Sequence, residues 1–103
     1  MLQKPDVHTQ RILDLADLIG GLSPERFLMS TWGMDQEPRC ICGWLMHNNA
    51  RMEKNDWKEA AKLLGIDEMT ASRLFSGHRA RYLDNAKAAR TLRHLAVTGE
   101  LDF

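Results

Sequence analysis

The sequence predicts an all-α protein, a small irregular bundle of five to six helices that contains a helix-turn-helix-like corner. Three observations lead to this prediction. Apolar residues recur at the helical spacing i, i+3, i+4, i+7, and no segment alternates like a strand over a useful length. Glycine, proline or a capping residue separates the periodic stretches. The length of 103 residues fits a single domain, 1–103.

The first element is a helix over Val7–Ile19, because its apolar residues form a stripe on one face. Gly20-Gly21 is expected to stop it. Ser23 as N-cap and Pro24 at the first helical position then predict a short second helix that ends near Leu28. The stripe of the first helix consists of Ile12, Leu15, Ala16 and Ile19.

The segment Met29–Arg39 breaks periodicity at Gly33 and Pro38, so we expect a packed loop there. The compact apolar run Cys40–His47 is expected to be helical and to end near Asn48-Asn49. Bulky aromatic residues in a helical domain of this size are more often core than ligand-stacking. That expectation applies to Trp32, Trp44 and Trp57.

Two helices joined by a tight turn are expected between Trp57 and Gly77. Asp56 with Glu59 resembles a capping box and opens the first of them, which Gly65 closes after Leu64. Asp67 can cap the second helix, Glu68–Ser76, which Gly77 ends.

A long helix is expected to finish the chain. Asp84 or Asn85 opens it, and Thr98-Gly99 ends it. Its predicted inward face consists of Ala89, Leu92, Leu95 and Ala96.

The stretch Ala60–Gly77 resembles the helix-turn-helix of phage-repressor-like DNA-binding domains. Ala61 is small enough for a close helix crossing, Gly65 suits a left-handed turn, and Ile66 can fill the corner. The resemblance implies that the second helix enters the major groove of double-stranded DNA. The side chains placed on base edges would be Glu68, Met69, Thr70, Ser72 and Arg73, and those placed on phosphates would be Ser76, His78, Arg79 and Arg81.

Charge distribution supports a phosphate partner only in part. The whole chain is neutral, but Met69–His94 holds six basic residues and one acid, a net charge of +5. Such a segment attracts phosphates or acidic proteins, or is simply a solvated face. Asp67 and Glu68 would repel phosphate at the start of the second helix, so a corner that only packs remains the alternative.

A second resemblance covers most of the chain from Arg26 onward. It is to a loose group of small phage and prophage proteins with a Phe-x-Met-x-x-Trp start, a Cys-Ile-x-Gly-Trp helix, a Leu-Leu-Gly corner and a final Thr-Gly-Glu. This resemblance implies core packing at the corner and transfers no activity. The matching residues are Phe27, Met29, Trp32, Cys40, Ile41, Gly43, Trp44, Leu63, Leu64, Gly65, Leu74, Phe75, Thr98, Gly99 and Glu100.

No catalytic or metal-binding motif is expected. On a helix, the thiols of Cys40 and Cys42 would point about 200° apart, and His47 would not complete a four-ligand set. A disulfide between the two cysteines would close a strained ring, so reduced thiols and a cytoplasmic location are expected. There is no paired-carboxylate motif or phosphate-binding glycine loop, so neither an enzyme nor a cofactor is predicted.

Two partner classes therefore remain, and neither is a membrane, because no apolar run approaches the ~20 residues a span needs. The first is double-stranded DNA, bound by a small regulator. The second is a host or phage protein, bound by a module whose corner is only structural. A homodimer is compatible with both.

Overall fold

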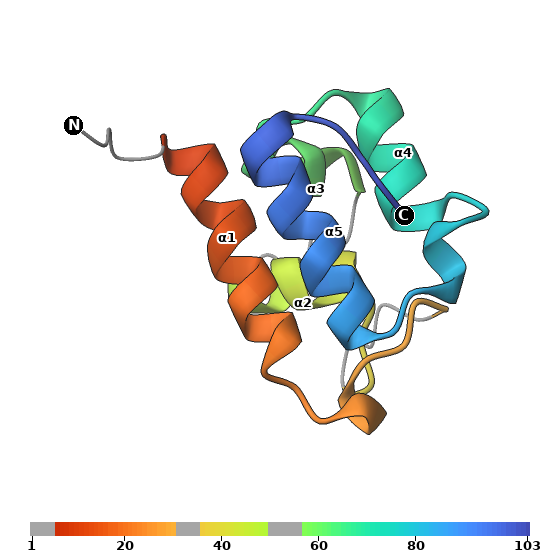
Figure 1. Ribbon diagram of the computed structural model, residues 1–103. Coiled ribbons are helices and arrows are strands. Elements are labelled where there is room, and N and C mark those ends of the chain that lie inside the picture. The colour runs from red at the N-terminus through yellow and green to blue at the C-terminus, as the bar shows by residue number, and fades with distance from the viewer. Residues whose placement is uncertain (1–5, 31–35, 50–56) are drawn as a thin grey trace.

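The computed structural model describes residues 6–30, 36–49 and 57–103, and the regular elements in this part of the chain are all helices, without a strand. The predicted all-α bundle is confirmed (Figure 1). Its elements are α1 (Val7–Gly20), η1 (Pro24–Arg26), α2 (Ile41–Asn48), α3 (Trp57–Leu64), α4 (Glu68–Ser76), η2 (Ala80–Tyr82) and α5 (Asn85–Thr98), where η marks a single 3₁₀ turn.

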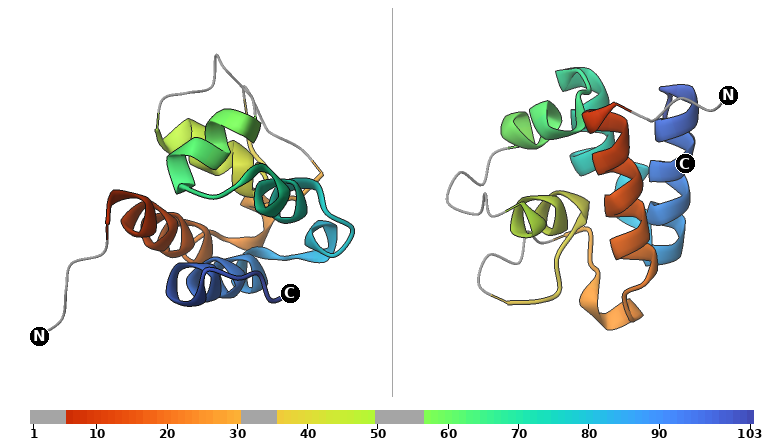
Figure 2. Two further views of the ribbon diagram at one scale, coloured as in Figure 1. Left: turned by 90° about the horizontal axis from the view of Figure 1, so that it is seen from above. Right: turned by 90° about the vertical axis from the view of Figure 1, so that its left-hand side faces the viewer.

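The two longest helices, α1 and α5, lie side by side and antiparallel, and α2 and α3 lie behind them in the view of Figure 1 (Figure 2). The buried residues of α1 are the four of the predicted stripe. Gly20 lets the two helices approach closely, because a Cβ at this position would lie only 3.2 Å from the Cβ of Ala89. Helix α1 also contacts α2 and α3, so the α1–α5 pair positions the shorter helices.

A buried amide ties the start of α5 to the end of α1. Asn85, only 9% exposed, donates from Nδ2 to the carbonyl oxygens of Leu22 at 2.7 Å and Ile19 at 3.4 Å. The last carbonyls of a helix have no partner within the helix. The carbonyl of Ile19 also accepts from the amide of Leu22 at 3.2 Å, so Asn85 mainly supplies the donor for the carbonyl of Leu22, just after the end of α1.

Replacing Asn85 by alanine is expected to lower the free energy of unfolding by about 1–3 kcal/mol, because the carbonyl of Leu22 stays buried without its donor. Urea unfolding followed by circular dichroism measures the change. Lys87→Ala, an exposed substitution in the same helical turn, should stay within about 0.5 kcal/mol of wild type. Equal losses in the two variants would contradict a structural role for the amide.

The predicted short helix from Ser23 to Leu28 is wrong in its extent. Only Pro24–Arg26 forms a turn, because Phe27 adopts an extended backbone and pairs with Arg39 in an isolated bridge. The amide of Leu28 donates to the carbonyl of Arg39 at 3.1 Å. This long-range pairing outcompetes one more helical turn.

Helix α2 begins one residue later than predicted. Cys40 has an extended backbone and acts as its N-cap, with Sγ accepting from the amide of Gly43 at 3.3 Å. Trp44 is buried as predicted, and its indole donates to the carbonyl oxygen of Arg26 at 3.1 Å. The guanidinium carbons of Arg26 and Arg39 lie 5.2 and 5.0 Å from the centre of the Trp44 ring, within cation–π range.

The expectations for the other tryptophans differ in outcome. Trp57 is half-buried against the core, whereas Trp32 lies outside the described residues, as does Asp56 of the predicted capping box.

None of the helices in the described ranges combines the length and the apolar character that crossing a membrane requires.

Candidate nucleic-acid interface

The corner between α3 and α4 is closed by a glycine-dependent turn. Gly65 has φ +67° and donates to the carbonyl of Lys62 at 3.2 Å, while the amide of Ile66 donates to the carbonyl of Ala61 at 3.1 Å. These two bonds form the Schellman motif that commonly ends helices. The left-handed turn predicted at Gly65 is therefore confirmed.

Two side chains of α1 complete the end of α3. Arg11 donates from Nη1 to the carbonyl oxygen of Leu63 at 3.2 Å, and Nδ1 of His8 lies 3.3 Å from the same oxygen. Basic groups suit this position because the C-terminal end of a helix carries partial negative charge. The long helix α1 therefore holds the corner in place.

Helix α4 begins at the predicted cap. Oδ1 of Asp67 accepts from the amide of Thr70 at 2.6 Å, and this bond holds the pKa of the Asp67 carboxyl below its usual range. Ala71, Leu74 and Phe75 turn inward and are buried. The exposed positions of α4 form an outward face that α5 does not cover; they are Glu68, Met69, Ser72, Arg73 and Ser76.

Six of the seven predicted site residues are exposed, and we call these six the basic face. They come from the second half of α4 and from the turn that follows it. They are Ser72, Arg73, Ser76, His78, Arg79 and Arg81.

Thr70 departs from the prediction, because it is half-buried and does not join the outward face. It lines a groove with Asp67, Leu95 and Gly99, between the corner and the end of α5. Ser76 is exposed, but its hydroxyl donates back to the carbonyl of Ser72 at 3.0 Å within the helix.

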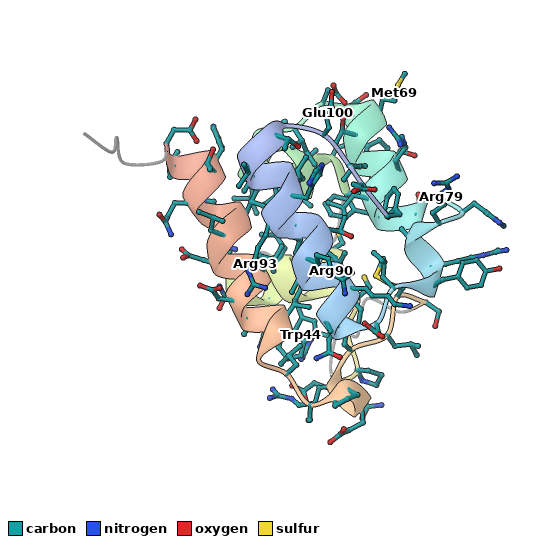
Figure 3. The ribbon with its side chains drawn as sticks, viewed as in Figure 1. Trp44, Met69, Arg79, Arg90, Arg93 and Glu100 are labelled. Carbon is teal, nitrogen blue, oxygen red and sulfur yellow. The ribbon has the colours of Figure 1, made fainter. Side chains whose placement is uncertain are left out.

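The two ends of α4 differ in charge. Asp67 and Glu68 lie at its start, and Figure 3 shows Met69 and Glu100 at that same end of the molecule. Arg79 lies beyond the opposite end. Because the sequence between Met69 and Leu83 contains no acidic residue, the basic face is cationic without interruption along the chain.

Tyr82 is a part of this surface that the sequence analysis missed. It is 67% exposed, and Arg81 stacks over its ring at 5.1 Å and donates to its hydroxyl at 3.2 Å. The ring of His78 meets the Tyr82 ring edge-on at 5.8 Å. The signal in the sequence was an aromatic residue directly after Arg81, since such a ring can hold a guanidinium in place.

A hollow of about 220 Å³ lies beside the basic face. It is lined by Arg73, Gly77, His78, Arg79 and Phe103, so the end of the described chain returns to α4. Gly77 has no room for a side chain, because a Cβ there would collide with the carbonyl oxygen of Arg73. The periodicity of α4 could not have indicated the contribution of Phe103.

Comparison with known proteins adds no assignment: no protein-family model, no curated protein and no solved structure matches this chain.

Proposed function

We propose that this protein binds double-stranded DNA through the basic face. The observation that carries the proposal is the exposed outward side of α4. It is followed in the sequence by the exposed His78, Arg79 and Arg81, and no acidic residue lies between Arg73 and Arg81. Affinity for duplex DNA is dominated by cations placed on phosphates. A helix of this size also fits the width of the major groove.

The charge difference along α4 suggests how the duplex would lie. In helix-turn-helix domains the early residues of the second helix contact base edges. Here the start of α4 carries Asp67 and Glu68, so we expect the duplex to approach the second half of the helix instead. Arg73 would then be the base-contacting side chain, since arginine pairs with guanine through two hydrogen bonds.

A salt titration tests this proposal. The wild-type chain should bind a mixed-sequence duplex at low salt, as measured by fluorescence anisotropy. The double variant Arg73→Ala/Arg79→Ala should lose affinity, and if both arginines contact phosphates its slope of log K against log salt should fall by about 1.8. If Arg73 reads a base edge, the fall in slope should be about half as large.

The control removes a positive charge elsewhere. Arg93 is exposed and pairs with Asp17 at 3.1 Å on the side of α5 that faces α1. Arg93→Ala should therefore leave the slope unchanged. The proposal fails if the wild-type chain does not bind duplex DNA at low salt, or if the double variant keeps the wild-type slope.

A second candidate function is protein binding, favoured by large apolar side chains that stay exposed. Met69 is 76% exposed at the start of α4, and Val97 is 82% exposed near the end of α5. Capture of a partner that survives nuclease treatment and is lost in the variant Met69→Ser would support this function. A partner that nuclease releases would count for the DNA proposal instead.

A further inference from the structure

The two cysteines of the chain face a common cavity, which their spacing on a helix did not predict. Cys40 lies outside α2 as its N-cap and Cys42 lies in the first helical turn, so the expected divergence of about 200° does not apply. Both thiols are reduced and buried, and both line a cavity of about 300 Å³.

A third sulfur lines the same cavity. Met29, whose side chain carries a thioether, is one of its lining residues, and Trp57 and Phe75 are the aromatic ones. The other lining residues are Ser30, Ser76 and Arg81, all exposed, so the cavity reaches solvent at this rim. Among the described residues that line it there is no carboxylate and no imidazole.

We propose that Cys40, Cys42 and Met29 form a binding site for a soft metal cation of the Cu(I) type. Thiolate and thioether sulfurs select such cations, whereas hard ions need oxygen ligands. Nowhere in the described chain, this cavity included, are three or more histidine, cysteine, aspartate or glutamate side chains gathered, so the site differs in kind from a zinc site with four such ligands.

Binding of Cu(I) at this cavity can be written with balanced atoms and charges. Binding of one Cu(I) by two thiols breaks two S–H bonds, forms two Cu–S bonds, releases two protons to solvent and leaves one net negative charge. Arg81 is the one cationic residue among those described that line the cavity, and its charge can offset the negative charge of the bound state. The first turn of α2 adds backbone amides, which favour anionic sulfur.

A coordinated metal deprotonates its thiol ligands directly. Binding is therefore expected to strengthen as pH rises, because the released protons are mass-action products.

The test is an anaerobic titration of the reduced full chain with Cu(I) in competition with bicinchoninate. One equivalent should bind, with release of two protons. Cys40→Ser keeps an N-cap acceptor but removes the soft donor, and Cys42→Ala keeps a small buried group. Each should weaken Cu(I) binding by at least about 100-fold, because even indirect partners of a metal ligand cost 10–100-fold.

The methionine has a matched control. Met29→Leu conserves volume and should weaken binding by roughly tenfold, whereas Met46→Leu removes a buried thioether that does not line the cavity and should change nothing. Absence of binding by the wild-type chain, or wild-type affinity in the double cysteine variant, would overturn the proposal. Should the cysteine variants unfold, protection of both wild-type thiols from alkylation by one equivalent of Cu(I) decides the same question. None of these measurements involves DNA, so their outcome is independent of the proposed function.

Discussion

Replacing Gly65 by alanine is expected to lower the free energy of unfolding by about 2–4 kcal/mol. The left-handed backbone at φ +67° accounts for roughly 1–2 kcal/mol of this cost in a residue with a side chain. The remainder comes from His8, because a Cβ at Gly65 would lie 2.5–2.9 Å from three carbons of that side chain. His8 must then leave the carbonyl oxygen of Leu63.

Gly99 provides the matched control for this substitution. Its φ is +77°, also left-handed, but a Cβ there would meet nothing within 4 Å. Gly99→Ala should therefore cost only the backbone term, about 1–2 kcal/mol. Urea unfolding of both variants isolates the contribution of His8 as the difference between them.

A double-mutant cycle completes the measurement. His8→Ala should relieve part of the damage in the Gly65→Ala background, and residues in contact typically couple by about 0.5–3 kcal/mol. If Gly65→Ala and Gly99→Ala cost the same and His8→Ala has no coupling with Gly65→Ala, the packing of α1 against the corner carries no energy. The placement of α3 and α4 by α1 would then be wrong.

Most helix ends could be predicted because their signals are local. Asp67 and Asp84 each accept a hydrogen bond from an amide three residues later, and Gly65 and Gly99 occupy left-handed positions next to the helices they end. The helical period also identified the buried stripe of α1. These signals need only the residues within one or two turns of the helix.

What the sequence could not predict depends on distant partners. Asn85 bonds to the carbonyls of Leu22 and Ile19, 63 and 66 positions away in the sequence, so nothing near Asn85 indicates its burial. Phe27 left the predicted second helix because Arg39 pairs with it. The apolar run predicts Cys40 inside the helix, whereas its backbone is extended and it lies just before α2.

The candidate interface likewise has features that the local sequence predicts and features that depend on distant segments. Exposure of Ser72 and Arg73 follows from the buried positions of α4, which the period of the helix indicates. The half-burial of Thr70 depends on a groove shared with Leu95 and Gly99 of another segment. The third sulfur of the cavity, Met29, likewise comes from a segment that no helical pattern connects to the cysteines.

Leu74→Ala is expected to destabilise the protein by about 2–5 kcal/mol, because truncating a fully buried leucine loses its transfer free energy and leaves a cavity. Leu74 is 0% exposed and lies on the inward side of α4. A domain of this size loses about 4–8 °C in Tm per kcal/mol, so differential scanning calorimetry should show a Tm lower by at least about 8 °C. The substitution leaves every residue of the basic face unchanged.

Ser72→Ala on the same helix separates the two sides of α4. It alters an exposed side chain and should change stability by no more than about 0.5 kcal/mol. At a temperature where both variants are folded, Leu74→Ala should bind duplex DNA like the wild-type chain, because phosphate contacts come from the outward side of the helix. A loss of stability in Ser72→Ala as large as that in Leu74→Ala would mean that α4 is rotated about its axis, and the basic face would then not exist as a surface.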